Sequence, residues 1–246
     1  AHVRLRRRGP GVPEVMIAVI ARNSIIRPIV VLVKIIASAL CISSGGSVGR
    51  EGPIVQIGAA IASTTGQILR LSPVQLKTLV GCGVAAGISA TFNAPIAGAL
   101  FSLELIVSDF GLTPFTPILV SSVSAAAITR HFHGNITEFI NLPPFNLVSP
   151  WEFAFYLILG LAAGVVSFVF SRSVYIGEDF FEKTKIPQWI RPAFGGIVIG
   201  IIALVYPHIM GVGYDTIEEL FNGKLTLGIM FFLVILKIFS TSVTLG

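Results

Sequence analysis

The sequence predicts an all-α membrane protein whose helices are broken within the membrane. Of its 246 residues, 54% are hydrophobic and only 12% are charged, and the mean hydropathy is +0.87. Soluble domains carry about 25% charged residues, so this composition excludes an ordinary soluble, disordered or coiled-coil protein. The 17 basic residues outnumber the 12 acidic ones. They lie in short clusters between apolar runs, which is typical of membrane edges and argues against a nucleic-acid partner.

Long runs without Asp, Glu, Lys or Arg supply the candidate membrane segments. A bilayer core needs about 20 residues of helix, and several of the runs reach that length. The runs cover residues 52–69, 78–103, 110–129, 153–171 and 192–214. The chain is therefore expected to be a multi-pass integral membrane protein.

Prolines interrupt these segments at defined places. Pro95 lies inside the run 78–103, where a proline removes a helix hydrogen bond and is expected to split the segment into two short helices. Pro13 and Pro53 each follow a glycine-containing loop, and proline is favoured at the start of a helix. Broken helices at membrane depth are tolerated only where the freed backbone is buried in protein or faces water. The pattern is typical of channels and transporters.

The two polar segments beside the run 153–171 differ in their basic residues. The segment 130–150 contains one arginine besides His131 and His133, whereas the segment 172–191 contains four Lys and Arg residues. By the positive-inside rule, the later segment is expected to be a cytoplasmic loop and the earlier one an external loop. The His-x-His pair has no Cys or carboxylate pair near it, so no metal site is predicted there.

Two short patterns recur at nearly the same offset. Residues 9–15 and 211–217 both read Gly-x-Gly-x-x-x-(Val/Ile) and lie 202 positions apart. Residues 31–38 and 234–241 share a central Lys-Ile step and lie 203 positions apart. Together they predict a duplicated unit of about 200 residues, and such repeats are a transporter architecture. The second copy reaches Gly246 where its polar loop is expected to begin.

The sharpest local motif is Gly49-Arg50-Glu51-Gly52-Pro53, at the start of an apolar run. Charges at membrane depth are costly and mark function. A helix that begins here presents free backbone N–H groups and the positive end of its dipole, which favour an anion, and glycines let the backbone approach an ion closely. Glu51 is then a tethered anion beside an anion site, which it can vacate when protonated or displaced. The alternative is that Arg50 and Glu51 pair at the membrane surface as a capped helix start.

This motif and its surroundings resemble the CLC family of chloride channels and chloride/proton antiporters. The similarity extends over residues 49–58, 92–98 and 101–104, and residues 9–13 resemble the family's first selectivity motif, Gly-Ser-Gly-Ile-Pro. The matches occur in family order over nearly the whole chain. The resemblance implies broken, tilted helices in two inverted repeats, and a homodimer with one pore per subunit.

The resemblance also divides the chain. Residues 1–129 are expected to be the later part of the first repeat, residues 130–151 an external loop and residues 152–246 the start of the second repeat. The first helices of the family and the second half of the second repeat are expected to lie outside this sequence. The second selectivity motif, Gly-x-Phe-x-Pro, and the pore tyrosine would then lie beyond Gly246.

Family roles can be carried over position by position. The resemblance implies that Glu51 is the gating glutamate and that Lys34 raises the electrostatic potential near the pathway. The substrate would be chloride or a similar monovalent anion, and no cofactor is implied. The implied anion-binding residues are Gly9, Pro10, Gly11, Val12, Pro13, Gly49, Arg50, Gly52 and Pro53.

Two positions depart from the family pattern. Pro10 replaces a serine whose hydroxyl contacts the central anion, and proline has no such donor. Plant vacuolar relatives with proline there resemble nitrate exchangers, so the preference for chloride over nitrate stays open. Leu105 lies where the antiporters place an internal proton-transfer glutamate. Leucine cannot carry a proton, which favours channel-like or proton-uncoupled conduction, with a chloride or nitrate/proton antiporter as the alternative.

Two further alternatives come from other classes. An intramembrane enzyme could use Glu51 as an acid or base, but the sequence has no HExxH motif and no carboxylate cluster to assist it, so the chain is not predicted to be an enzyme. Without the second motif, the chain by itself could also be an inactive structural piece. Four other acids are expected to flank helix ends in solvent, namely Glu14, Asp215, Glu218 and Glu219.

Overall fold

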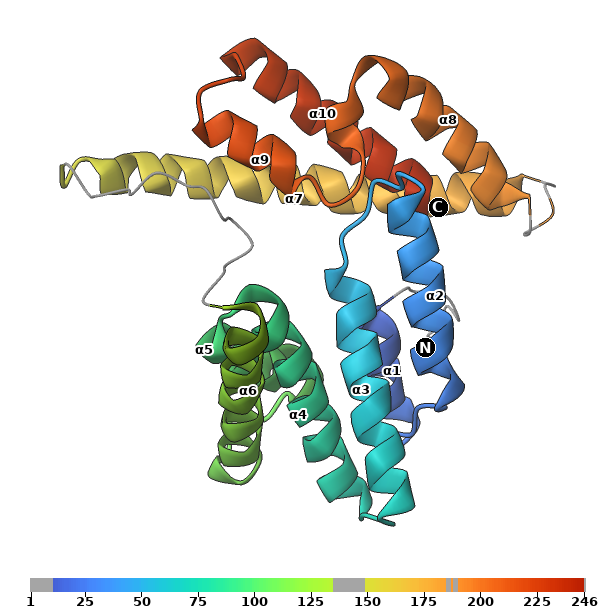
Figure 1. Cartoon of the computed structure of the whole chain (residues 1–246), viewed down its shortest axis with the longest axis vertical. Helices are drawn as coiled ribbons and strands as arrows, with labels where there is room; N and C mark the ends of the chain where they lie inside the picture. The colour runs from blue at the N-terminus through green and yellow to red at the C-terminus, as the bar shows by residue number, and fades with distance from the viewer. Residues whose placement is uncertain (1–10, 135–148, 185–186, 188–189, 246) are drawn as a thin grey trace, which may run out of the picture. The chain divides into compact units, whose positions relative to one another are not determined.

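The computed structural model describes residues 11–134, 149–184, 187 and 190–245. Gly9 and Pro10, two of the predicted anion-binding residues, lie outside these ranges. All regular elements in the described ranges are helices. They belong to two compact units, one of residues 1–40 and 50–140 and the other of residues 41–49 and 141–246 (Figure 1). The predicted all-α class is confirmed.

The first unit is organised around the helix α4. The helix packs against α3, α5 and α6, and α1 packs against α3. The elements are α1 (Val12–Ala21), α2 (Ile29–Ser43, whose last turn belongs to the second unit), α3 (Glu51–Ile68), α4 (Pro73–Phe92), α5 (Pro95–Phe101), η1 (Ser102–Val107, a π-helical turn) and α6 (Leu112–His133). Small residues allow this packing. A side-chain carbon added at Gly58 of α3 would overlap the backbone of Gly83 in α4, and the reverse also holds. Close backbone approach through small residues is typical of helices that associate in membranes.

Serine hydroxyls also join the helices of the first unit. The Ser89 Oγ donates a hydrogen bond to the Ser122 carbonyl oxygen at 2.6 Å, and the Ser122 Oγ donates to the Pro95 carbonyl oxygen at 2.6 Å. These bonds connect α4, α6 and the start of α5. Interhelical hydrogen bonds of this kind stabilise helix packing where no water is present.

The predicted helix breaks are confirmed. The helix α4 ends at Phe92, Asn93 adopts a left-handed φ of 54°, and α5 begins at Pro95. The run 78–103 is therefore broken at the predicted place, but only the second helix is short, because α4 begins at Pro73 and runs for 20 residues. Pro13 and Pro53 lie in the first turns of α1 and α3, as their positions after glycine-containing loops predict.

The second unit contains a helix much longer than its predicted span. Its elements are α7 (Glu152–Lys183), α8 (Arg191–Val205), η2 (Pro207–Ile209, a short 3-10 helix), α9 (Tyr214–Phe221) and α10 (Leu227–Leu245). The segment 172–191 was expected to be a loop, but α7 runs for 32 residues and ends at Lys183. The prediction was wrong because charged residues do not end a helix, and the first proline after the apolar run is Pro187.

The predicted external loop 130–150 begins later than expected, because its first residues are still helical. The helix α6 continues through Arg130 to His133, so His131 and His133 lie in its last turn and not in a loop. The histidines are helix-compatible residues, and α6 is followed by Gly134 at a φ of 78°.

The sequence repeat has a structural counterpart. The helices α1 and α9 each follow a glycine with positive φ, Gly11 at 87° and Gly213 at 96°, and these glycines lie 202 positions apart. The helices α2 and α10 each carry one lysine, Lys34 and Lys237, 203 positions apart. Corresponding elements therefore follow in the same order in the two halves of the chain.

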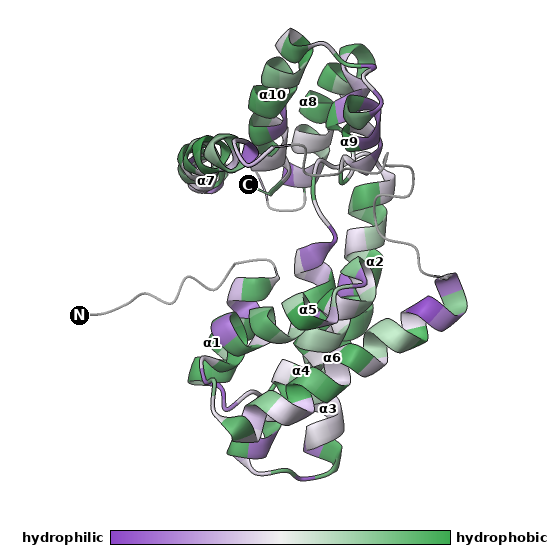
Figure 2. Cartoon of the chain, turned by 90° about the vertical axis from the view of Figure 1, so that its left-hand side faces the viewer, coloured by the Kyte–Doolittle hydropathy of each residue, from purple (hydrophilic) through white to green (hydrophobic). Residues whose placement is uncertain are grey.

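The described helices suit a bilayer. Four of them, α4, α6, α7 and α10, are long and apolar enough to cross a membrane, and α1, α2, α5 with η1, and α8 are shorter apolar helices. Hydrophobic colouring covers most of the helical ribbon in both units (Figure 2). Several apolar helices with little burial show that this is a multi-pass integral membrane protein.

Candidate functional site

The N-termini of α1 and α3 meet in the first unit. A side-chain carbon added at Gly11, directly before α1, would lie 2.8 Å from the Cα of Gly52 in the first turn of α3. Gly11 also has a φ of 87°, a conformation that side-chain-bearing residues rarely adopt. Two glycine-containing motifs that are far apart in the sequence are thereby brought into backbone contact.

At the start of each helix, the backbone N–H groups that precede the first helical hydrogen bond have no partner within the helix. In α1 this bond runs from the Val15 N–H to the Gly11 carbonyl, and in α3 from the Ile54 N–H to the Arg50 carbonyl. Gly11, the N-cap of α1, has no side chain, and the side chain of Arg50, the N-cap of α3, does not cap the helix. The early N–H groups and the positive ends of two helix dipoles therefore lie together, which is an arrangement that attracts an anion.

The structure places most of the predicted residues at this junction. Glu51 is the first residue of α3 and Arg50 its N-cap, and both side chains are half-buried. Val12 and Pro13 form the start of α1. Gly49 belongs to the segment 41–49, which is grouped with the second unit.

Leu105 is more than 50 positions later in the sequence than Glu51. It is part of the π-helical turn η1 and is 38% exposed. The neighbouring Ile106 and Val107 are buried, so the apolar face of η1 is directed into the unit while Leu105 lies on its more accessible side.

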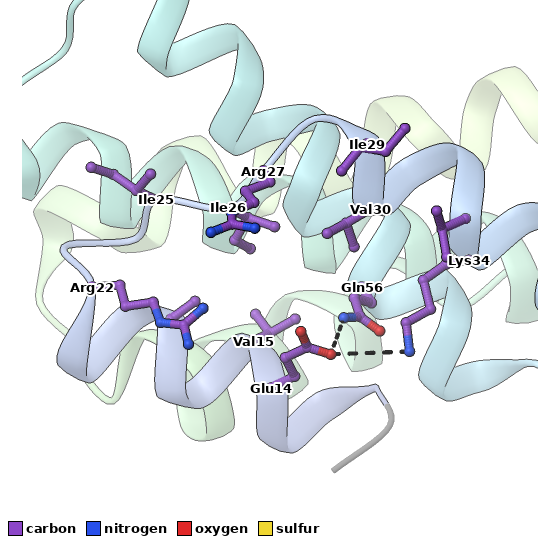
Figure 3. Close-up of a pocket in the computed structure, with 12 residues that line it drawn as sticks. Glu14, Val15, Arg22, Ile25, Ile26, Arg27, Ile29, Val30, Lys34 and Gln56 are labelled. Atoms are coloured by element: carbon purple, nitrogen blue, oxygen red, sulfur yellow. Dashed lines mark hydrogen bonds and ion pairs between the residues drawn. The ribbon is translucent and has the colours of Figure 1, made fainter. Parts of the chain in front are cut away.

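A polar cluster that the sequence did not reveal connects α1, α2 and α3. The Gln56 Nε2 of α3 donates a hydrogen bond to the Glu14 Oε2 of α1 at 2.5 Å, and the Lys34 Nζ of α2 lies 4.0 Å from the same oxygen (Figure 3). Gln56 is buried, with 1% of its surface exposed. Glu14 lies in the first turn of α1 and 46% of its side chain is exposed, so its predicted place at a helix end is confirmed, but the contacts of its carboxylate with Gln56 and Lys34 were not predicted.

A cavity of about 800 Å³ lies beside the polar cluster. Its walls come from α1, the loop that follows α1, α2 and Gln56 of α3. Figure 3 shows Arg22 and Arg27 around the same space as Glu14 and Lys34. Among the described residues that line the cavity, three are basic and one, Glu14, is acidic. The net positive charge of the lining favours anions.

Lys237, which lies 203 positions after Lys34, has different hydrogen-bond partners. The Lys237 Nζ donates hydrogen bonds to the carbonyl oxygens of Ile209 at 2.9 Å and Gly211 at 2.7 Å, just before α9. The position that corresponds to Glu14 is Thr216, whose hydroxyl donates to the His208 carbonyl oxygen at 3.2 Å. Lys237 therefore fixes a turn, whereas Lys34 faces a carboxylate.

Comparison with known proteins identifies relatives over the whole chain. The family model described as "Voltage gated chloride channel" matches residues 2–246. The chain is 35% identical over 231 residues to a ClcB-like chloride channel protein of Ralstonia nicotianae, and the match covers 92% of this chain and 52% of the relative. It is 30% identical over 247 residues to the H(+)/Cl(-) exchange transporter ClcA of Yersinia pestis, with 97% and 51% covered. The chain thus spans about half the length of these curated relatives.

A solved structure supports the same relationship. The chain matches the crystal structure of a CLC-type fluoride/proton antiporter with a TM-score of 0.74 and 25% identity, covering 94% of this chain and 59% of that chain. Proteins of this kind are channels and transporters, so the family gives no support to the enzyme alternative. Sequence, helix order and structural likeness agree: the chain belongs to the CLC family of voltage-gated chloride channels and related transporters.

Proposed function

We propose that the protein containing this chain transports chloride or a similar monovalent anion across a lipid bilayer, and that the junction of α1 and α3 is part of the anion pathway. The backbone contact between Gly11 and Gly52 carries this proposal, since it brings two helix N-termini together. Backbone N–H groups there can replace part of the hydration shell of an anion. Several weak sites of this kind let an ion enter and leave again.

Glu51 is the proposed gate. Its carboxylate begins α3, so it is a tethered anion at the helix end that attracts the transported anion. The side chain and the anion then compete for one region of positive potential. Protonation removes the charge of Glu51 and frees the region for the anion.

The mode of transport has two candidates. Leu105 favours channel-like or proton-uncoupled conduction, because a leucine in η1 cannot exchange a proton. Anion/proton exchange fits at least as well with the relatives, since ClcA is named as an H(+)/Cl(-) exchange transporter and the solved structure is described as a fluoride/proton antiporter. Pro10 keeps nitrate beside chloride as a candidate substrate, and a homodimer remains a prediction.

The test is flux from liposomes that contain the protein at its full natural length. Chloride, nitrate and pH are recorded together while a proton gradient is imposed. Channel-like conduction predicts anion flux that carries no protons and is not driven by the proton gradient. An exchanger predicts uphill anion movement driven by protons, and the lack of any anion flux would contradict the proposed function.

A further inference from the structure

The polar cluster of Glu14, Lys34 and Gln56 lies against apolar packing. Gln56 is buried beside Val55 and Ala59 in the contact between α1 and α3. Its Nε2 donates to Glu14, but its Oε1 is buried and has no hydrogen-bond partner among the described residues. A buried amide that is only partly satisfied costs stability, so its position needs a compensating role.

The charge of Glu14 opposes the field of the site to which it is attached. Glu14 is in the first turn of α1, where a carboxylate interacts favourably with the positive helix end. The same carboxylate repels an anion bound at that end. Lys34, 4.0 Å from the Glu14 Oε2, has the opposite effect on the anion.

Gln56 holds the Glu14 carboxylate in position. Its hydrogen bond fixes Glu14 to α3, the helix that begins with Glu51, so the carboxylate remains between α3 and Lys34. The other charges around the cavity are Arg22 and Arg27, for which the described part of the chain shows no ion pair. Arg22 is the C-cap of α1 and Arg27 lies in the loop that follows it, so Glu14 is the acid that faces Lys34 near the N-terminal end of α1.

We propose that Glu14 is a charge-balancing residue that weakens anion binding at the α1 N-terminus by offsetting Lys34, with Gln56 holding its carboxylate in place. The proposal rests on the proposed function of the α1/α3 junction as an anion pathway. Its effect is to keep the anion from binding too tightly, because a transported ion must also leave. Glu14 acts through Lys34 and the helix field and is thus a positioning residue.

The test is chloride binding to the purified full-length protein by isothermal titration calorimetry. E14Q keeps the shape of the side chain and removes its charge, and it is expected to tighten chloride binding about two- to fivefold, as charges near helix ends do. K34M is expected to weaken binding by a similar factor. The double variant E14Q/K34M is expected to return to within about twofold of the wild type, because the two charges oppose each other.

Matched controls separate charge from structure. D109N removes one negative charge in the turn between η1 and α6, outside the cluster, and is expected to leave chloride binding unchanged. K34R keeps the charge and is expected to remain close to the wild type, and E14D, which keeps the charge on a shorter side chain, is expected to remain closer to the wild type than E14Q. If K34M does not fold, the contrast between E14Q and E14D decides the question.

Shifts of equal sign in E14Q and K34M, or no shift in either, would overturn the charge-balancing role. A merely structural role predicts that both variants lose thermal stability and bind chloride more weakly. A wild-type protein that binds no chloride would instead contradict the proposed function and this inference with it. The two failures are therefore distinguishable.

Discussion

Gly11 and Gly52 are in backbone contact: a side-chain carbon placed on Gly11 would lie 2.8 Å from the Gly52 Cα. This contact joins the start of α1 to the first turn of α3. It requires a residue without a side chain at position 11 for two independent reasons, the close approach and the φ of 87°. The geometry of the candidate anion site therefore depends on one glycine more than on any side chain.

Gly11→Ala is expected to lower both stability and transport. The added carbon would overlap the Gly52 backbone, and alanine at position 11 would have to adopt an unfavourable positive φ. A loss of about 1–3 kcal/mol of stability is therefore expected. Thermal unfolding in detergent and anion efflux from liposomes measure the two effects. Gly160→Ala is the control, because no described atom lies within 4 Å of a side-chain carbon at this position. Wild-type efflux from Gly11→Ala would show that the contact is not needed.

Gly83→Ala is expected to separate α3 from α4. The added carbon would overlap the Gly58 carbonyl and crowd Ala62, and neither backbone can move without disturbing the centre of the first unit. Overpacking of this kind costs about 1–3 kcal/mol, which thermal unfolding would detect. Gly164→Ala, in the open part of α7, should unfold at the wild-type temperature. Equal unfolding temperatures for both variants would refute the packing of α3 against α4.

Pro10→Ser is expected to shift anion preference towards chloride. The resemblance places a serine hydroxyl against the central anion in most family members, and Pro10 has no hydroxyl to donate. A net hydrogen bond contributes about 0.5–1.5 kcal/mol, so the ratio of chloride to nitrate flux should rise about two- to tenfold. Competition between the two anions in the same liposomes gives the ratio directly. An unchanged ratio would mean that position 10 does not contact the anion.

Leu105→Glu is expected to introduce proton movement. Leu105 is 38% exposed in η1, so a carboxyl group can be accommodated there without entering a packed core. If Leu105 is the reason for uncoupled conduction, the variant moves protons together with anions and the wild type does not. Leu105→Gln has nearly the same shape and cannot exchange a proton in this way, so it serves as the control. Proton coupling already present in the wild type would assign the inner proton to another residue.

The sequence predicted features that depend on local covalent geometry. Proline has no backbone N–H to donate, which explains the break at Pro95 and the helix starts near Pro13 and Pro53. The uncharged runs were predictable because a segment that crosses the apolar core of a bilayer needs about 20 residues. The end of α7 at Lys183 was not predicted. Charged residues indicate where a segment leaves the membrane, but the helix can continue through them into water.

The site was predictable only in part. The two glycine motifs were predicted to line the pathway through their family resemblance, and the structure brings Gly11 and Gly52 together. The cluster of Glu14, Lys34 and Gln56 could not be predicted, since it depends on how three helices pack. Lys34 was singled out through the family resemblance and Glu14 as a lone acid at the start of a short apolar helix, but nothing in the sequence indicated that the two residues face each other.

The most direct test of the account is anion efflux from liposomes with Glu51→Gln beside the wild type, with chloride and pH recorded together. A glutamate gate predicts that the wild type conducts faster as the pH falls, because protonation removes the competing charge. Glu51→Gln should conduct faster than the wild type and lose this pH dependence, and any proton coupling of the wild type should disappear with it. An efflux rate and pH dependence identical to those of the wild type would contradict the assignment of Glu51 as the gate.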